Sequence, residues 1–410
     1  MTPPRFDALI LNAGVRQSLM AIRSLGRRSL RVAAALAGTS EAERIPAFAS
    51  RWCAGPVHFE APDGSDGYLT RLDSWLTQSG ARVVIPSHDG TISMLRAHRA
   101  RIERQTRIAM ASEAALEIAV NKERTLAAAR RVGLLVPREA VIRGSPDLRA
   151  ALRDIGLPAV VKPAESWVGE DETGHWVGPK LVVTEAEATA AVEAVTRFGA
   201  AVLFQQYLTG RREAVSFLYA RGQIHASFAQ WASRTRPPLG GESVLRQSIA
   251  IPPDLGPGAE ALIREIDLEG YSEVEFRRDG EGRPYLMEIN PRLSASVEVA
   301  VRAGVDFPLL LYRWAAGERI PSVPSYRVGG WMRNLGGDVD SALLAMGEQG
   351  RPGIPSRPRI LLDFAASFFR PSGYDYFWWS DPGPAVIATG RFFKNQVWAR
   401  VASRIRRVFR

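Results

Sequence analysis

The sequence has 410 residues, 46% of them hydrophobic and 23% charged, which is typical of a folded protein with roughly two to four domains. Its formal net charge is +10, but residues 384–410 carry seven basic side chains and no acidic one, which leaves +3 for the other 383 residues. This near balance excludes a general nucleic-acid-binding function and indicates a basic tail instead.

A single cysteine, Cys53, excludes an internal disulfide and fits a reducing compartment. The first residues lack the basic and apolar pattern of a signal peptide, and no stretch approaches the roughly 20 apolar residues of a spanning helix. We therefore expect a cytoplasmic protein.

Short apolar strands alternate with helices over residues 1–110. We expect strands at 7–12, 30–36 and 82–86, and helices at 16–25, 68–78 and about 90–101. Such alternation predicts an α/β domain with a parallel sheet, whose ligand edge would lie near 12–14 and 86–90.

The elements expected beyond residue 110 are of mixed type. Helices are expected at 112–132, 148–155, 185–198, 257–267 and 298–303, strands at 157–163, 202–208, 213–220, 225–231, 272–277 and 283–289, and loops at 165–179 and 234–241. The turn 279–282 (Asp-Gly-Glu-Gly) predicts that the last two strands form a hairpin.

Only four of the 53 basic residues are lysines, namely Lys122, Lys162, Lys180 and Lys394. A position that kept lysine among so many arginines is a candidate for needing a compact ammonium charge. Lys162 ends the apolar run 157–163, and a buried lysine is costly unless it meets an anion. Phosphate is the leading candidate for that anion.

The predicted hairpin carries two acids and an amide. Glu288 and Asn290 are two apart on its second strand and therefore face the same side, and Glu275 on the first strand can lie beside them. These oxygen ligands suit Mg²⁺ that also binds substrate phosphates. Arg292 follows the turn at Pro291 with a guanidinium fork suited to phosphate.

The ordered set of these motifs resembles the ATP-grasp superfamily. The set comprises Lys122, Val160-Val161-Lys162-Pro163, a flexible loop, 204–210 with Glu213, and finally Glu275 with 288–292. It is most similar to the branch of carbamoyl-phosphate synthase large subunits and related carboxylate–amine ligases. The resemblance covers about residues 1–320. It implies an α/β pre-ATP-grasp domain at 1–110, a two-lobed ATP-grasp domain at 111–320 with a lid loop near 165–180, and a helical C-terminal extension at 321–410.

The resemblance also implies a role for each matched residue. Lys122 and Lys162 would contact the ATP phosphates and the base edge, and the latter would also act in catalysis. The backbone of Gln206, Tyr207 and Leu208 would pair with adenine, and Glu213 would take the ribose hydroxyls. Glu275, Glu288 and Asn290 would hold two Mg²⁺ ions, for which Mn²⁺ could substitute, and Arg292 would stabilise the transferring phosphoryl group.

Two features depart from the family pattern. The family usually has Glu where this chain has Gln206, which leaves the choice of ATP over GTP open. The loop at 165–179 carries Trp167, Trp176 and the acidic run 170–172 in place of a small, glycine-dense lid.

The implied reaction is the ATP-dependent activation of a carboxylate as an acyl phosphate, which an amine or similar nucleophile then attacks. The implied partners are therefore a small carboxylate and a small amine, with no specific nucleic acid. Two alternatives stay open, namely an enzyme of the carboxyphosphate or carbamoyl-phosphate type and a non-catalytic nucleotide-binding protein. A homodimer is also left open. Substrate contacts are expected from His88, from 234–236 with 240–243, and from 293–296.

The C-terminal residues 390–410 have apolar side chains at helical spacing with arginines between them. This pattern predicts a basic amphipathic helix, and three surroundings stay open for it: the protein's own body, a protein partner, or an anionic membrane at its inner face. The aromatic run 374–379 before it indicates either a core-docking segment or a membrane-interface anchor.

Overall fold

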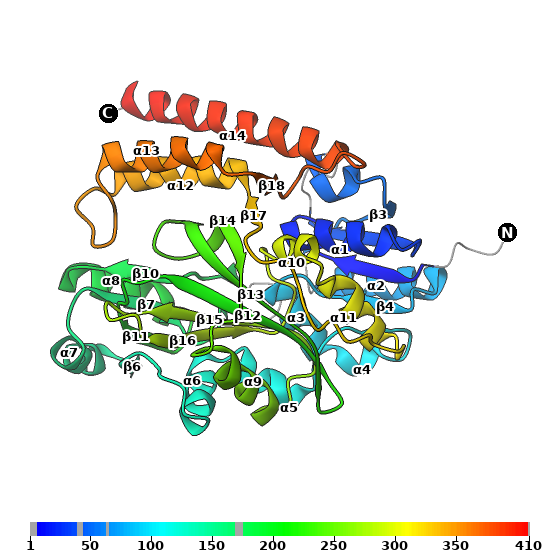
Figure 1. Cartoon of the computed structure of the whole chain (residues 1–410), viewed down its shortest axis with the longest axis horizontal. Coiled ribbons are helices and arrows are strands. Elements are labelled where there is room, and N and C mark those ends of the chain that lie inside the picture. Colours follow the sequence, from blue (N-terminus) through cyan, green and yellow to red (C-terminus); the bar gives the residue numbers. More distant parts are fainter. Residues whose placement is uncertain (1–5, 39–43, 63–64, 169–174, 409–410) are drawn as a thin grey trace.

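The computed structural model describes residues 6–38, 44–62, 65–168 and 175–408. Their secondary structure forms three main sheets with helices packed around them, and a layer of helices at the C-terminal end (Figure 1). No helix within these residues is both long and apolar enough to cross a membrane.

The N-terminal part is a parallel five-stranded sheet, as predicted. Its elements are β1 (Ala8–Leu11), α1 (Arg16–Gly26), β2 (Val32–Ala37), the 3-10 helix η2 (Pro46–Ala49), β3 (Cys53–Phe59), α2 (Asp66–Ser79), β4 (Val83–Ile85), α3 (Asp89–Ala97), α4 (Arg99–Ile102) and β5 (Arg107–Ile108). The strand order is β3-β2-β1-β4-β5, so the order reverses between β1 and β4. Such a switch point is where open parallel sheets bind ligands. Strand β3 is not predicted from the sequence.

Two helices of this sheet, α2 and α3, begin at a side-chain cap. Ser65 accepts a hydrogen bond from the backbone N–H of Tyr68 at the start of α2. His88 caps α3 by accepting from the N–H of Gly90, while Thr91 bonds back to it. A cap of this kind contributes about 1 kcal/mol to a helix. It also fixes where α3 begins, directly after β4 at the switch point.

A second, antiparallel sheet follows two linking helices. Its elements are α5 (Glu113–Ala119), α6 (Lys122–Arg131), β6 (Glu139–Ile142), α7 (Ser145–Asp154), β7 (Ala159–Pro163), β10 (Lys180–Val182), α8 (Glu185–Thr196) and β11 (Val202–Gln206), in strand order β10-β7-β11-β6. Helices α7 and α8 cover one face, where Leu148, Val161, Val192 and Phe204 belong to one core. The other face carries Lys162. Between β7 and β10, the short strands β8 (Trp167–Val168) and β9 (His175–Trp176) pair as a hairpin.

The third sheet has seven strands. Its elements are β12 (Arg212–Ala220), β13 (Gln223–Arg236), β14 (Glu242–Ile249), α9 (Gly256–Glu265), β15 (Gly270–Arg278), β16 (Pro284–Asn290), α10 (Glu298–Ala303), α11 (Phe307–Ala315), β17 (Trp331–Arg333) and β18 (Ser372–Tyr374). The strand order is β16-β15-β12-β13-β14-β17-β18. The predicted β15–β16 hairpin is present, with Glu275 directly opposite Glu288. Strands β17 and β18 come from beyond residue 320 and join the same sheet.

The loop expected at 234–241 is wrong in its first half. Residues 234–236 belong to β13 and pair with β14, and only the remainder forms the turn between these strands. Gly241 has a φ of +80°, and a Cβ there would lie 2.5 Å from the carbonyl oxygen of Arg236. Glycine is therefore required for the tight turn and not for a ligand.

The C-terminal helices form a layer along one edge of the molecule (Figure 1). They are α12 (Leu335–Gly347), α13 (Arg357–Ala366) with the 3-10 turn η4 (Ser367–Phe369), and α14 (Gly383–Val408). Helix α14 begins seven residues before the predicted start at 390 and packs on the protein's own body. A Cβ at Gly336 of α12 would lie 3.1 Å from the Phe392 ring, and Gln396 donates to Asp340.

Candidate active site between two sheets

Two acids and an amide lie together on one face of the β15–β16 hairpin. Glu275 and Glu288 are direct cross-strand neighbours, and Asn290 donates a hydrogen bond of 3.0 Å to Glu275 Oε1. Glu273 faces the same side, where it accepts from Gln230 at 2.7 Å. The hairpin thus brings together the three residues that the sequence predicted as metal ligands.

Both predicted lysines approach this hairpin from other elements. Lys122 is the first residue of α6, where its Nζ lies 3.7 Å from Glu288 Oε2 and donates to Ser166 Oγ at 2.8 Å. Lys162, only 4% exposed, reaches across from β7 and donates to the carbonyl oxygen of Met287 at 3.3 Å. Two ammonium groups and two carboxylates therefore face one another between the second and third sheets.

Burial and neighbouring charge shift the ionisation of this cluster in opposite directions. Burial raises the pKa of Glu275 to about 7, with Glu288 adding to the shift and Arg212 opposing it. Burial alone would also raise the pKa of Glu288, but Lys122, Lys162 and Arg212 together hold it below its usual value. Burial lowers the pKa of Lys162 to about 8. Pairs of groups whose pKa values are pushed apart in this way are common in active sites.

Arg292 connects the hairpin to the N-terminal domain. Its Nε and Nη2 donate to the two carboxylate oxygens of Asp89, at 2.5 and 3.0 Å, where Asp89 is the first residue of α3. A cleft lies between α3, the start of α6, Trp167 of β8 and the end of β16. The switch point of the first sheet and the acidic hairpin thus border the same cleft.

The described part of the lid loop packs on the N-terminal domain. The Trp167 ring meets the His88 ring edge-on at 5.8 Å, and a Cβ at Gly90 would come within 2.8 Å of the Trp167 ring. His88 therefore has structural contacts on both sides, as the cap of α3 and against the lid. Burial lowers its pKa and favours the neutral ring. The acidic run 170–172 lies outside the described residues.

The residues predicted to pair with adenine lie at the end of β11, but their side chains turn away from the cluster. Gln206 Oε1 accepts from the backbone N–H of Arg138 at 3.4 Å, the Tyr207 hydroxyl donates to the carbonyl oxygen of Pro352, and Leu208 is buried. Any contact from 206–208 to a base would therefore come from the backbone.

The neighbouring Gln205 is a site residue that the sequence reading missed. It pairs with Glu139 of β6 and lies two residues from Leu203, the partner of Lys162, so all three polar side chains face the same side of the sheet. Gln205 is 0% exposed, and neither end of its amide makes a hydrogen bond of normal geometry among the described residues, although Gln205 lies close enough to Glu139 to help lower the pKa of that carboxyl against the effect of burial. Glu139 Oε2 is likewise without a partner. Buried polar atoms without partners are rare and need an explanation, and a bound ligand is one.

Glu213 is not brought to this cluster. It lies on the opposite face of the sheet, level with Phe276, and forms ion pairs with Arg211 at 2.9 Å and Arg278 at 2.6 Å. Its neighbour Arg212 faces the cluster instead and bonds to Glu275 Oε2. The alternation of apolar Val215 and Phe217 could have revealed this, because Glu213 shares their face of the strand.

The donor set fits magnesium bound together with phosphates. No group of three or more His, Cys, Asp or Glu side chains converges on a metal position within the described residues. Glu275 and Glu288 with the Asn290 oxygen supply only part of an octahedral shell. Mg²⁺ is commonly bound in this way, by one or two carboxylates plus substrate phosphates, and not in an all-protein cage.

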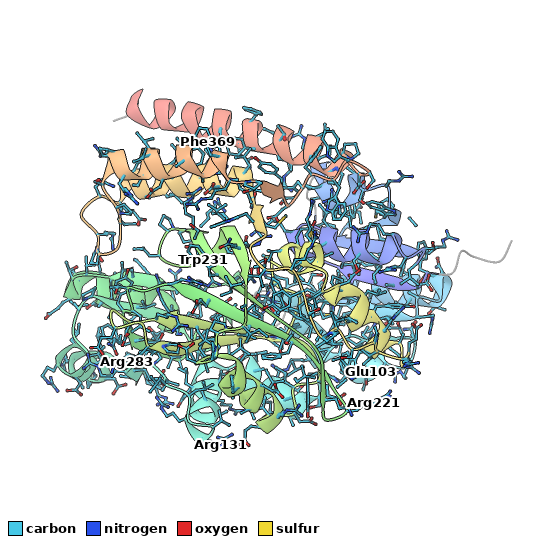
Figure 2. The ribbon with its side chains drawn as sticks, viewed as in Figure 1. Glu103, Arg131, Arg221, Trp231, Arg283 and Phe369 are labelled. Carbon is cyan, nitrogen blue, oxygen red and sulfur yellow. The ribbon has the colours of Figure 1, made fainter. Side chains whose placement is uncertain are left out.

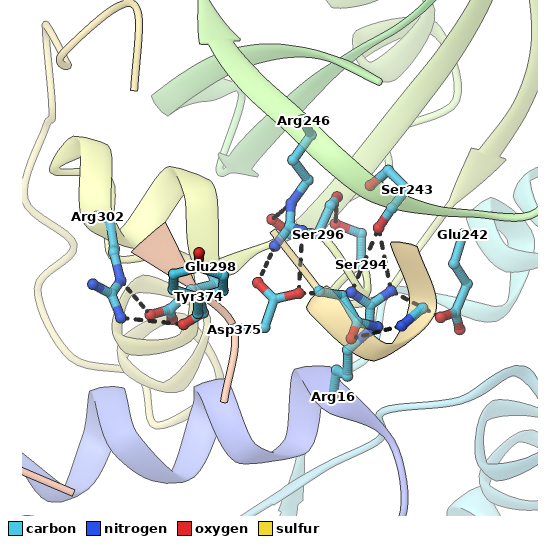
Figure 3. A network of polar contacts seen from close by, with 12 residues as sticks. Arg16, Glu242, Ser243, Arg246, Ser294, Ser296, Glu298, Arg302, Tyr374 and Asp375 are labelled. Atoms are coloured by element: carbon cyan, nitrogen blue, oxygen red, sulfur yellow. Dashed lines mark hydrogen bonds and ion pairs between the residues drawn. The ribbon is translucent and has the colours of Figure 1, made fainter. Parts of the chain in front are cut away.

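A buried polar network extends from the third sheet to the C-terminal segment (Figure 3). Asp375, 1% exposed, accepts from Arg246 of β14 at 2.5 and 3.1 Å and from Arg16 of α1 at 2.7 Å. Arg246 also donates to the carbonyl oxygen of Ser296. The segment after β18 thus joins the N-terminal domain to the sheet that carries the hairpin. Of the expected substrate contacts, Arg234 is instead paired with Asp338 of α12.

Comparison with known proteins agrees with this geometry. Residues 199–333 match the family model described as "ATP-grasp in the biosynthetic pathway with Ter operon". The matched segment includes the whole acidic hairpin, Arg212 and Arg292.

Residues 199–333 are therefore similar to an ATP-grasp domain.

Solved ATP-grasp structures share its fold. The biotin carboxylase domain of 2-oxoglutarate carboxylase from Hydrogenobacter thermophilus, in complex with MgADP and bicarbonate, has a TM-score of 0.63 at 17% identity and covers 80% of this chain and 73% of its own. The L-amino acid ligase from Bacillus licheniformis has a TM-score of 0.57 at 17% identity, covering 76% and 74%. These likenesses show the fold alone.

Curated relatives of this chain include D-alanine–D-alanine ligases. That of Xanthomonas axonopodis pv. citri is 30% identical over 216 residues, and that of Chromohalobacter salexigens is 27% identical over 214 residues. Each match covers 48% of this chain and 64% of the relative. The chain therefore spans less than two thirds of the length of these relatives.

Proposed function

We propose that this protein is an ATP-dependent carbon–nitrogen ligase, which activates a carboxylate as an acyl phosphate and transfers the acyl group to an amine. The observation that carries the proposal is the juxtaposition of Glu275, Glu288 and Asn290 with Lys122 and Lys162 between the second and third sheets. The resemblance of the chain to D-alanine–D-alanine ligases and to an L-amino acid ligase supports the same reaction class.

ATP would lie between the second and third sheets. The ammonium groups of Lys122 and Lys162 are placed to meet its phosphates, and each is already held by a protein contact that orients it. The base would reach the end of β11, where the backbone of 206–208 and the unpartnered amide of Gln205 offer donors and acceptors. Glu213 as a ribose ligand finds no support in its position, and Arg212 is the residue of this strand that faces the cluster.

Magnesium would bind at Glu275, Glu288 and Asn290, with two ions in the proposal and Mn²⁺ as a substitute. When bound, it neutralises the charge that builds up on the transferring phosphoryl group. The lysines and Arg292 act on the same charge from fixed positions, which is the main way in which proteins accelerate phosphoryl transfer.

The carboxylate and amine would enter the cleft beside α3. A carboxylate oxygen attacks the γ-phosphorus of ATP, ADP leaves, and an acyl phosphate forms. The amine then attacks the acyl carbon, the bond to phosphate breaks, and the amine loses a proton. Trp167, packed against α3, would exclude water from the acyl phosphate while both steps occur.

The cellular setting belongs to the proposal as well. One half-buried thiol, Cys53, suits a reducing compartment such as the cytoplasm, where ATP and amino acids are available. Small-molecule substrates fit a cleft of this kind, and a dimer stays open.

The test is ADP release by the purified protein over a panel of carboxylates and amines, including amino acids of both chiralities. With the correct pair, a carboxylate labelled with oxygen-18 should transfer one labelled oxygen to the released phosphate, because that oxygen bridges the acyl phosphate. Glu288→Gln should reduce ADP release by at least ~100-fold. Glu281→Gln is the matched control, because Glu281 is an exposed acid at the turn of the same hairpin.

Two results would contradict the proposal. One is full ADP release by Glu288→Gln, which would remove the hairpin from the reaction. The other is substrate-dependent ADP release without transfer of the label, which would exclude the acyl phosphate.

A further inference from the structure

The C-terminal layer displays most of the large apolar side chains that are exposed within the described residues. On α13 and η4, Leu361 is 55% exposed, Leu362 62% and Phe369 89%. Trp379, in the segment before α14, is 90% exposed. Figure 2 shows Phe369 on this layer, at the opposite edge of the molecule from Arg131 of α6. Large apolar side chains that are exposed in number on one part of a molecule indicate an interaction site.

Helix α13 directs much of its apolar surface outward. Ile360 is buried against α12, together with part of Phe364. Leu361, Leu362 and Phe369 remain exposed on other sides of the helix and its 3-10 extension. A helix that only had to fold onto the body would carry polar residues at these positions.

Helix α14, in its described half, also packs on the body with one side and exposes apolar side chains on another. Phe392 and Gln396 face α12. Val386 and Phe393, seven residues apart and therefore on one side of the helix, are 68% and 62% exposed. The helix thus packs on the body with one side and offers apolar side chains on another.

From α13 to the C-terminal end the charge of this layer is basic, and the two acids of α12, Asp338 and Asp340, are paired with Arg234 and Arg236. Between residues 357 and 396 there are five basic side chains and three acidic ones. Two of the acids, Asp375 and Asp381, are each 1% exposed and paired with buried arginines, so they add nothing to the surface. The third, Asp363, is paired with Arg359. From 397 to 410 the sequence adds five more basic residues and no acid.

We propose that this layer lies flat on an anionic lipid bilayer, with Phe369, Trp379 and Phe393 entering the interface and the arginines contacting lipid headgroups. Exposed aromatic side chains together with arginine, spread along helices that are too polar to cross a membrane, are characteristic of interfacial binding. Each basic residue near an anionic surface adds attraction that salt weakens. This inference is independent of the ligase proposal.

The experiment is co-sedimentation of the full chain with vesicles of phosphatidylcholine, alone or mixed with phosphatidylglycerol. The wild type should sediment with the anionic vesicles only, and less as salt is raised. The double variant Phe369→Ser/Trp379→Ser should partition at least ~10-fold less. Leu135→Ser is the matched control, because Leu135 is 47% exposed but lies outside this layer, and it should bind like the wild type.

The fold of each variant is checked by circular dichroism and by ATP binding, since no residue of the layer lines the cleft. Equal binding to neutral vesicles, or unchanged binding of the double variant, would overturn the proposal. So would wild-type self-association without lipid that the double variant abolishes, because the layer would then be an interface between two copies of this chain.

Discussion

The carboxylate of Asp89 accepts both hydrogen bonds of the Arg292 fork, and the two residues are 203 positions apart in the sequence. Asp89 begins α3 of the N-terminal domain, and Arg292 follows the hairpin that carries Glu288 and Asn290. The pair is largely buried, and Arg292 outweighs the effect of burial to hold the pKa of Asp89 below its usual value. The arginine proposed to stabilise the phosphoryl group is therefore positioned by a different domain.

Asp89→Asn should lower the rate of ADP release about 10- to 100-fold, because an amide can accept only one arm of the fork and Arg292 would lose its fixed direction. Stability should fall by about 1–3 kcal/mol. Asp73→Asn removes a partly exposed partner of Arg101 in the same domain and serves as the control. Equal rates for the two variants would show that Arg292 needs no positioning by Asp89.

The low pKa of Lys162, about 8, predicts how ATP affinity depends on pH. In the free protein the Lys162 ammonium is charged below pH 8 and neutral above it. The affinity for ATP should therefore fall as the pH rises through 8. Near this pH, ATP should bind with uptake of a proton by Lys162. Calorimetry in buffers of different ionisation enthalpy measures that uptake. Lys162→Met should abolish it, whereas uptake that persists in this variant would assign the proton to another group.

Although Lys162 should favour ATP binding, its buried charge should lower the stability of the ligand-free protein. Because the folded pKa lies below the ordinary 10.5, the unfolded chain binds the proton more tightly between pH 8 and 10.5, and burial of the charge costs stability at neutral pH. Lys162→Met without ligand should therefore be more stable than the wild type at pH 7, by on the order of 1–3 kcal/mol. The difference should close as pH rises through this range in denaturant titrations.

Gln205→Leu should separate binding from folding. The buried amide has no partner in the described structure, so an apolar side chain of similar size should leave stability unchanged or raise it. Affinity for ATP should nevertheless fall about 10-fold if the amide contacts the base. Ligand-free melting and ATP titration of the one variant provide both values. Reduced stability together with unchanged affinity would make Gln205 a purely structural residue.

The sequence predicts the hairpin and its ligand set because that information is local. An alternating pattern, a strong turn and a strand-ending proline specify where Glu275, Glu288 and Asn290 lie without reference to the remaining chain. The β/α order of residues 1–110 is equally local, and both predictions of fold are confirmed.

Other features depend on partners far away in the sequence. Arg234 extends β13 because it pairs with Asp338, which no pattern near 234 reveals, while the following prolines and glycines favour a loop. The resemblance assigns Glu213 to the ribose, although the apolar positions beside it place it on the other face of β12. The roles of Gln205 and Asp89 emerge only when two sheets and two domains are placed together.

Asp375→Asn should destabilise the whole protein. Asp375 accepts from Arg16 and Arg246 in a site where it is 1% exposed, and loss of its charge leaves Arg246 without a carboxylate partner and Arg16 with Glu242 alone. Breaking such a buried pair typically costs about 3–5 kcal/mol. Asp363→Asn, at an exposed i,i+4 pair, should cost less than about 1 kcal/mol. Chemical unfolding of both variants gives the comparison, and equal losses would contradict a central role for Asp375.

The position of Asp375 in the chain also sets an order of assembly. Arg16, in the first helix, and Arg246, in a central strand, are both synthesised well before the carboxylate that neutralises them. Until the segment after β18 has left the ribosome, Arg246 has no carboxylate partner, and burying its charge between the N-terminal domain and the large sheet is unfavourable. A nascent chain that stops short of this segment should therefore hold these two parts together less tightly than the finished protein does.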